Sequence, residues 1–339
     1  MVILIVKHGA IIRKRGSTLV VSKIVKSKDS ENEEKSKYET VTVPLIDIEM
    51  LVIVGSRVRL SSGVILMLSL AQIPIIVHSR RADSIIYTPF YVRIADVRRR
   101  FYKLLENYNW KCAIASAFVR GKIKGMLNIA RYFTYKAIEK GNAGKYKEYL
   151  DVLKQYDKEV VLELSCVERL EDIRSLESVW SKRLWELIKL FIPKGYEFTG
   201  REPKAKDPIN SAISFTYAII YGLCTHALIA AGLDPYAGIL HAERAGRTSL
   251  TYDFSEMFKP VAIHAVLVSS RIADLNVGRD GYLTSSSLRT VTKILYKTLR
   301  RRHRSWRYTV RGEIYAKAWE LRQNIEKATK FHPFIYSIK

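Results

Sequence analysis

Strand-like patterns fill the first part of the chain. Runs rich in β-branched residues, bounded by glycine, proline or polar residues, predict strands at 2–12, 18–25, 38–62 and 73–79. The apolar run GVILMLSL at 63–70 predicts a short buried helix, and the polar insert 26–38 is typical of a solvated hairpin tip. The pattern therefore predicts a compact, mostly β domain over residues 1–88.

Helical periodicity replaces strand alternation near residues 85–92, where we place the domain boundary. Segments with an apolar stripe or a long apolar run predict helices at 92–141, 145–164, 170–191, 211–233, 258–275 and 315–330. GNAG at 141–144 is a helix break. The predicted fold class is therefore α+β and multidomain, with a mostly β N-terminal domain (1–88) followed by a larger all-α C-terminal domain (89–339).

One predicted helix requires a membrane check. Residues 211–233 contain no Asp, Glu, Lys or Arg over 23 residues, which is long enough to cross a bilayer. Hydroxyl side chains, His226 and many small residues interrupt the run, so we expect the central buried helix of the helical domain and no membrane partner. Asp207 or Asn210 is expected to cap this helix, with Pro208 in its first turn.

The charge balance predicts a polyanionic partner. Lys and Arg number 57 against 33 Asp and Glu, a formal net charge of +24. Nucleic acid is the simplest partner for such an excess, and an anionic membrane surface is the rival. Three cysteines, all more than fifty residues apart, suggest neither a zinc knuckle nor a disulfide framework. With an apolar start too short for a signal peptide, this predicts a cytoplasmic protein.

Residues 289–311 are the strongest candidate DNA surface. They hold nine Lys or Arg and no acid, with Tyr296, Trp306 and Tyr308 interleaved. A charge run is usually a solvated face, but in a chain of this net charge it predicts phosphate contact with base stacking. The arginines that we expect on DNA in this stretch are Arg300, Arg301, Arg302 and Arg304.

Candidate chemistry lies in residues 231–260, AGLDPYAGILHAERAGRTSLTYDFSEMFKP. His241 follows a short apolar run, and Asp253 and Glu256 are three residues apart, so they share a helix face. A histidine and two carboxylates beside a basic loop suit a hard metal ion next to a phosphate-binding surface. The alternatives are a structural histidine and acids that complement a helix N-terminus. Further phosphate-binding candidates are Arg201, Arg244, Arg247 and Lys259.

Residues 170–191 contribute a further acid. The apolar stripe of this predicted helix consists of Leu176, Trp180, Leu184, Leu187 and Phe191. Glu177 lies at the edge of the stripe rather than on the opposite, solvated face. A carboxylate in that place is paired or functional, unless it is an ordinary exposed side chain.

From Glu177 to Pro260 the chain resembles the CRISPR-associated integrases, the Cas-one family. ESVWSKRLW is similar to the glutamate-bearing helix of that family, and DPINSAISFTYAIIYG to its next helix. AGLDPYAGILH and GRTSLTYDFSEMFKP resemble its histidine and acidic blocks. Ser178 stands where Gly is usual, Lys259 stands where Arg is usual, and the loop 26–38 is a local elaboration.

The resemblance implies a homodimer and a metal-dependent DNA endonuclease and integrase. It implies Mg²⁺ or Mn²⁺ held by Glu177, His241 and Glu256, with Asp253 as the fourth catalytic residue. A single histidine beside carboxylates shifts the preference towards Mn²⁺. The substrate implied is double-stranded DNA, inserted into a CRISPR array by attack of a 3′-hydroxyl, with the small Cas-two protein as partner. His241 is alternatively a general base or acid in that step.

The rival hypothesis is a non-catalytic, basic, dimeric DNA-binding scaffold. In such a protein the acids are structural and the basic surface alone accounts for function. Metal binding that depends on Glu177 and Glu256 separates the two hypotheses.

Overall fold

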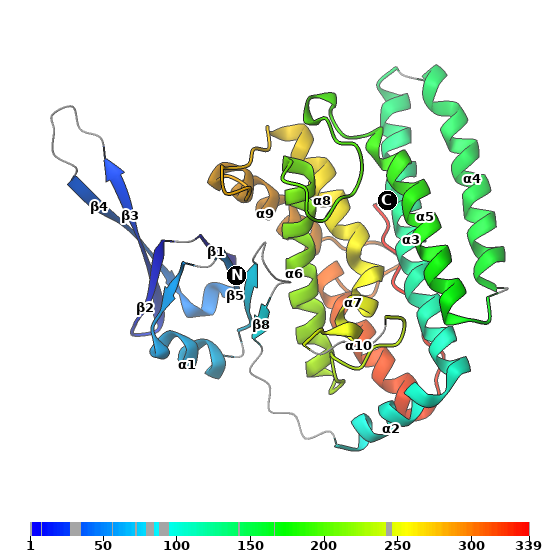
Figure 1. Cartoon of the computed structure of the whole chain (residues 1–339), viewed down its shortest axis with the longest axis horizontal. Coiled ribbons are helices and arrows are strands. Elements are labelled where there is room, and N and C mark those ends of the chain that lie inside the picture. Colours follow the sequence, from blue (N-terminus) through cyan, green and yellow to red (C-terminus); the bar gives the residue numbers. More distant parts are fainter. Residues whose placement is uncertain are drawn as a thin grey trace. The chain divides into compact units, whose positions relative to one another are not determined.

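A computed structural model describes residues 2–7, 9–27, 35–55, 57–71, 73–78, 85–87, 95–141, 143–165, 167–241 and 246–338. The chain divides into two compact units, 1–91 and 92–339. The predicted boundary, between residues 88 and 89, falls in a segment outside the described residues. Strands dominate the first unit and helices the second (Figure 1), so the predicted α+β fold class is confirmed.

Two four-stranded sheets form the N-terminal unit. The first has the order β1-β5-β7-β8, in which β8 is antiparallel to β7 and the other pairs are parallel. The second has the order β4-β3-β2-β6. Their strands are β1 Val2–Lys7, β2 Ala10–Arg15, β3 Thr18–Ser27, β4 Lys35–Pro44, β5 Ile48–Val54, β6 Arg59–Leu60, β7 Ile75–His78 and β8 Ile85–Tyr87. Fully buried apolar residues such as Ile12, Leu19 and Leu51 form the core of the unit.

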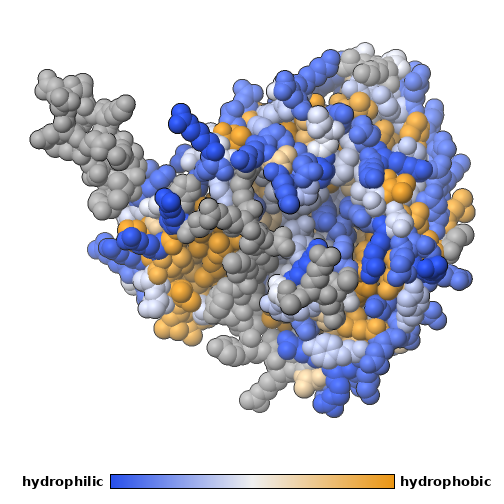
Figure 2. All heavy atoms as spheres, viewed as in Figure 1, coloured by the Kyte–Doolittle hydropathy of each residue, from blue (hydrophilic) through white to orange (hydrophobic). Residues whose placement is uncertain are grey.

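Two local predictions for this unit need correction. Both ends of the polar insert are strand, because β3 and β4 pair as far as Ser27 and Lys35, and residues 28–34 lie outside the described part. The predicted short helix forms as α1 (Ser62–Leu70), but it is not buried throughout. Its Leu66 and Leu70 side chains are 60% and 78% exposed. These two side chains contribute to the apolar surface of this unit. Figure 2 shows apolar surface in the region of α1.

The described residues of the helical unit form helices α2 to α10. Its helices are α2 Ala95–Glu106, α3 Tyr108–Glu139, α4 Ala143–Ser165, α5 Leu170–Lys189, α6 Pro208–Ala230, α7 Ser249–Ser255, α8 Lys259–Ile272, α9 Ser285–Leu299 and α10 Val310–Lys327. The helix predicted over 92–141 is two helices, because the Asn107 side chain caps α3 by accepting a hydrogen bond from the Trp110 N–H. Helices α3, α4 and α5 lie side by side (Figure 1).

Helix α6 is the centre of the helical unit. It is long and apolar enough to cross a membrane by length and composition, but 78% of its most apolar window is buried inside the protein. Helices α7, α8 and α10 pack around it. As predicted, Asp207 caps it by accepting from the Asn210 N–H, and Pro208 occupies its first position. The core-helix interpretation of 211–233 is therefore the one that the packing supports.

The segment after α10 is irregular yet packed into the core. Phe334 and Tyr336 are 2% and 0% exposed, and Phe334 stacks on Phe258 with ring centroids 4.9 Å apart. Tyr336 shares a hydrogen bond of 2.7 Å with His264, whose pKa burial lowers to about 3, so the imidazole stays neutral. Gly121 on α3 makes room for this segment, because a Cβ there would lie 2.6 Å from the Phe334 carbonyl oxygen.

Gly121→Ala should therefore destabilise the protein, because the added methyl cannot fit against the backbone of the C-terminal segment. We expect a loss of about 1–3 kcal/mol, the usual range for overpacking, measured by chemical denaturation. The matched control is Gly144→Ala in α4, where a Cβ would meet no atom within 4 Å. That variant should be neutral or slightly stabilising. Equal stability of the two variants would contradict this packing.

Candidate active site

All four predicted catalytic side chains belong to the helical unit. Glu177 lies on α5, and Asp253 lies on α7. Glu256 begins the single 3-10 turn η3 (Glu256–Phe258) that links α7 to α8. His241 lies in the segment between α6 and α7. The fold therefore has to unite residues that are more than sixty positions apart in the chain.

The Asp253 carboxylate is the anchor of the turn that carries His241. Asp253 is 0% exposed, and its Oδ2 accepts hydrogen bonds from the N–H groups of Ile239 and Leu240 at 2.7 and 2.8 Å. Its Oδ1 accepts from the His241 N–H at 3.1 Å and also contacts His241 Nδ1. Because a carboxylate only accepts, Nδ1 carries the proton, and in the neutral ring the lone pair is then on Nε2. Asp253 therefore orients His241.

Two more residues constrain the same turn. Arg174, one helical turn before Glu177 on α5, donates from Nε to the Leu240 carbonyl oxygen at 2.6 Å. Gly238 has no room for a side chain, since a Cβ there would lie 2.6 Å from the His241 carbonyl oxygen. Asp253 thus binds N–H groups of the turn, and Arg174 binds one of its carbonyl oxygens. Arg174 ties it directly to the helix that bears Glu177.

A buried lysine joins the two glutamates. The ammonium of Lys122, on α3, contacts Glu177 Oε1 and lies 2.9 Å from Glu256 Oε2, and Lys122 is only 7% exposed. Lys259, the first residue of α8, contacts the other oxygen of Glu256. The result is a largely buried row of alternating charges drawn from four elements, which we call the charge row: Glu177, Lys122, Glu256 and Lys259.

The charge row stabilises its own ionised state. Burial opposes ionisation of Glu256, but Lys122 and Lys259 outweigh it and lower the pKa of Glu256 to about 2. Burial likewise opposes the charge of Lys122. Its pKa nevertheless lies above the ordinary lysine value, because Glu256 and Glu177 favour the ammonium. Glu256 and Lys122 are therefore both charged at neutral pH.

The three predicted metal ligands are not gathered around one point. Across the described residues, no group of three His, Cys, Asp or Glu side chains is placed to hold a metal ion. Glu177 and Glu256 both contact the Lys122 ammonium instead. The donor set still fits a hard divalent ion, because it offers two carboxylates and the oriented imidazole of His241.

One oxygen atom of the donor set has lone pairs that no hydrogen bond from the described residues uses. Within the described part of the chain, the buried Oε2 of Glu256 accepts no hydrogen bond. The Lys122 ammonium lies 2.9 Å away, so the contact is an ion pair without hydrogen-bond alignment. A buried carboxylate oxygen with unused lone pairs is suited to a metal ion.

Lys122 and Arg174 were not predicted from the sequence as residues of the site. A signal for Lys122 exists in the helical periodicity, because Val119 and Met126, three residues before it and four after it, are fully buried. A lysine on the apolar face of a predicted helix requires an acidic partner. Nothing local distinguishes Arg174, whose partner Leu240 lies 66 residues further along the chain.

Arg201, a predicted DNA contact, is engaged inside the helical unit. Its guanidinium donates to Asn210 Oδ1 and Ser214 Oγ, both at 3.0 Å, and lies 5.6 Å from the centre of the Tyr217 ring. Burial lowers the pKa of Arg201. These contacts fasten the loop before α6 to the first turns of that helix. Arg201 therefore has a structural role, and its contact with DNA stays a prediction.

The loop cations near the charge row differ in their surroundings. Arg244 lies outside the described residues. The Arg247 guanidinium lies 4.8 Å from the centre of the Tyr252 ring, and its Nε has no hydrogen-bond partner among the described residues. Lys259 is paired with Glu256. Arg247 thus has a buried donor without a partner among the described residues, whereas Lys259 is part of the charge row.

The basic stretch 289–311 is divided between core packing and surface. Arg301 donates to the Ile338 carbonyl oxygen at 2.6 Å, so it anchors the C-terminal segment. The Trp306 ring stacks on Tyr336 with centroids 5.7 Å apart. Base stacking was predicted for the aromatic residues of this stretch, and for Trp306, which is partly buried, it stays a prediction. Its ring packs against the C-terminal segment.

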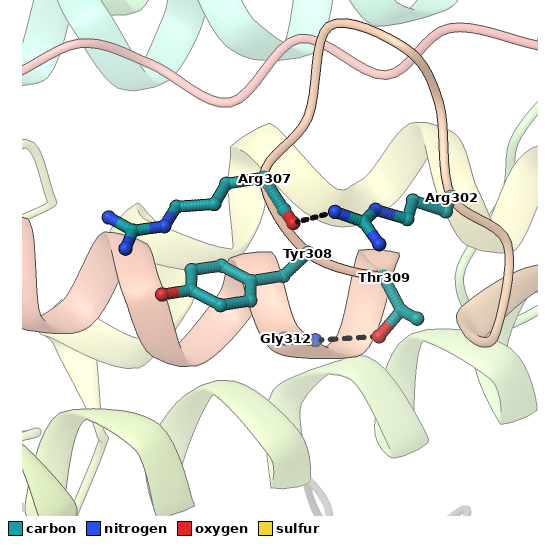
Figure 3. A pocket seen from close by; sticks show the side chains of 5 residues that line it. All are labelled: Arg302, Arg307, Tyr308, Thr309 and Gly312. Atoms are coloured by element: carbon teal, nitrogen blue, oxygen red, sulfur yellow. Dashed lines mark hydrogen bonds between the residues drawn. The ribbon is translucent and has the colours of Figure 1, made fainter.

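An open hollow at the start of α10 is lined in part by exposed arginines. It is lined by Arg302, Arg307, Tyr308, Thr309 and Gly312 (Figure 3). Arg302 donates to the Arg307 carbonyl oxygen at 2.9 Å, and the Arg307 guanidinium lies over the Tyr308 ring at 5.4 Å. The other exposed arginines of the predicted set are Arg300 and Arg304. This part of the stretch offers both charge and an exposed aromatic ring.

Comparison with protein families decides the identity. The model of the family described as CRISPR associated protein Cas1 matches residues 3–302. The chain belongs to the Cas1 family. The match includes the charge row and the His241 turn, so both are features of a Cas1 protein.

Relatives and solved structures agree with this assignment. A CRISPR-associated endonuclease Cas1 from Hyperthermus butylicus is 31% identical over 303 residues, 85% of this chain and 88% of the relative. A casposase bound to an integration product shares the fold, with a TM-score of 0.77, 20% identity and coverage of 98% and 93% of the two chains. A chain of a Cas6-RT-Cas1–Cas2 complex has a TM-score of 0.70, 18% identity and coverage of 97% and 36%.

Arg174→Met should loosen the His241 turn, because Met keeps the apolar stem but removes the donor to Leu240. Losing a hydrogen bond from a charged group costs about 1.5–3 kcal/mol, so amide exchange at 239–241 should accelerate about tenfold or more. Native-state hydrogen exchange measures this. Lys182→Met, exposed on the same helix, is the control and should leave exchange unchanged. Equal exchange in the two variants would refute the clamp.

Stability should fall in acid partly through Glu256. Its pKa is lowered from 4.5 to about 2, so the charged form contributes stability above the ordinary glutamate range. That contribution is lost as the pH falls from about 4.5 to about 2. Glu256→Gln should therefore flatten the pH dependence of unfolding between pH 7 and pH 3, measured by urea denaturation. Glu186→Gln, exposed on α5, should keep the wild-type slope.

Proposed function

We propose that this protein is a divalent-metal-dependent DNA integrase and endonuclease that inserts DNA fragments as new spacers into CRISPR arrays. The observation that carries the proposal is that Glu177 and Glu256 meet on one buried lysine, while Asp253, three residues before Glu256, orients His241 in the same strongly basic chain. The Cas1 membership supplies the biological setting. The reaction is transesterification by a DNA 3′-hydroxyl.

Glu177, Glu256 and His241 Nε2 are the groups that would hold Mg²⁺ or Mn²⁺. When bound, such an ion supplies Lewis-acid polarisation of the scissile phosphate and lowers the pKa of the attacking hydroxyl. Asp253 keeps the proton on His241 Nδ1, so that the neutral ring would offer its lone pair at Nε2. If Nε2 is not a ligand, the same orientation suits it to accept the hydroxyl proton as a general base.

DNA is the proposed substrate because the net charge is +24. The exposed part of the basic stretch offers Arg300, Arg302, Arg304 and Arg307 to phosphates, and Tyr308 is 43% exposed. Cas2 is the proposed protein partner, by likeness to the Cas6-RT-Cas1–Cas2 complex. A homodimer is proposed as well, and the exposed apolar face of α1 supports a protein contact on the N-terminal unit.

The second candidate is a non-catalytic DNA-binding scaffold. One observation favours it: Lys122 and Lys259 already neutralise the two glutamates. A structural charge row would look the same. The oriented His241 favours the integrase, since a scaffold has no use for an imidazole held at both its backbone N–H and its Nδ1.

Strand transfer tests the proposal. A 3′-hydroxyl DNA duplex is incubated with supercoiled plasmid and Mn²⁺ or Mg²⁺, and joined products are counted. His241→Ala and Glu177→Gln should each lower the rate by about 100-fold or more, whereas Glu186→Gln should retain it. Wild-type rates in both site variants would reject the site. Salt-sensitive DNA binding with no transfer by the wild type would establish the scaffold instead.

A further inference from the structure

A charged ammonium deep inside a protein needs a reason. Lys122 is 7% exposed and contacts carboxylates from two different elements, α5 and η3, while belonging itself to α3. Removing water from an ammonium is costly unless its partners compensate well. Here the compensation comes from the two acids that the proposed function assigns to the metal ion.

The charge row is balanced without any bound ion. It contains two carboxylates and two ammonium groups, so its net charge is zero. Two neighbouring buried carboxylates with no cation between them would repel, and one would take up a proton. Lys122 removes that repulsion, because its ammonium lies against both glutamates.

A divalent ion entering the same cluster would unbalance it. Adding two positive charges to a neutral, largely buried row leaves an excess that the surrounding protein cannot solvate. Binding of the ion is therefore coupled to the departure of an ammonium from the carboxylates. The ammonium that has to leave is the one that contacts the carboxylate oxygens to which the ion would bind.

Lys122 fits that description better than Lys259. Among the carboxylates of the described residues, Lys259 contacts Glu256 alone, three residues earlier in the chain. Its ammonium also lies 5.5 Å from the centre of the Tyr217 ring, which offers it a second partner. Lys122 contacts both Glu177 and Glu256. On Glu256 it faces Oε2, the buried oxygen that accepts no hydrogen bond from the described residues.

We propose that Lys122 is a positioning residue that acts as an internal counter-ion. It holds Glu177 and Glu256 together before the divalent ion arrives and competes with that ion for both carboxylates. The inference rests on the proposed function only in taking these two glutamates as metal ligands. It adds that Lys122 lowers the affinity of the site for the ion. In the absence of the ion, the same lysine keeps the two glutamates in place.

Metal binding in the absence of DNA tests this competition. Purified full-length protein is stripped with a chelator, and Mn²⁺ is titrated by calorimetry and followed by electron paramagnetic resonance. Lys122→Met, which keeps the stem and removes the charge, should bind Mn²⁺ about tenfold tighter or more, because a unit charge next to the ion has gone. Lys122→Arg should bind as weakly as the wild type. Lys124→Met, two residues on and paired with Asp157 instead, is the control and should change nothing.

Thermal unfolding supplies a second readout. Without metal, Lys122→Met should melt at a lower temperature than the wild type, because the two glutamates lose their common partner. Saturating Mn²⁺ should raise its melting temperature by more than it raises that of the wild type. A variant that folds only when Mn²⁺ is present would give the same support. If Lys122→Met is too unstable to titrate, Lys122→Gln replaces it, with the same expectation.

The outcomes separate this inference from the proposed function. If Glu177→Gln and Glu256→Gln bind Mn²⁺ as the wild type does, or if none of these proteins binds it, the ligand assignment is wrong. If the wild type binds Mn²⁺ through these glutamates but Lys122→Met and Lys122→Gln bind no tighter, the competition is refuted. In that case the ligand assignment is untouched.

Discussion

The Asp253 carboxylate is the interaction on which the rest of the site depends. It is fully buried and accepts the N–H groups of three successive residues, 239–241, while also contacting the His241 ring. One side chain thus satisfies buried backbone donors and orients the imidazole at the same time. Because Arg174 holds the same turn from α5, the geometry of the histidine and of Glu177 is shared between two rigid helices.

Electrostatic balance is the second constraint, and it explains the disagreement between the donor set and the geometry. The residues have the chemistry of a hard-metal site, yet the carboxylates are drawn to Lys122 and Lys259 rather than to a common point. Buried acids seek the nearest compensating charge. The proposed metal ligands are therefore paired with ammonium groups in this structure, and under the proposed function a divalent ion would compete for the same carboxylates.

Sequence patterns predicted the elements well where one local signal dominated. The strand runs, the stripe of α5 and the Asp207–Pro208 start of α6 are such cases, and the His241, Asp253 and Glu256 block was visible from residue types and spacing. Contacts between distant residues were not predicted. Arg174 and Lys122 act on groups more than fifty residues away, and Trp306 and Arg201 are occupied by contacts that no local pattern encodes. Periodicity reports which face is buried, but not which charge meets which.

The packing of the C-terminal segment has a consequence for the order of events during synthesis. Phe334 lies against Gly121 and stacks on Phe258, and these two residues adjoin Lys122 and the η3 turn of Glu256. A ribosome releases its chain from the N-terminus onward, and domains fold as units once they have emerged. The N-terminal unit can thus form during elongation, whereas the support beneath the charge row arrives only with residues 331–338. We therefore expect the charge row to be completed only after the basic stretch 289–311 has left the ribosome.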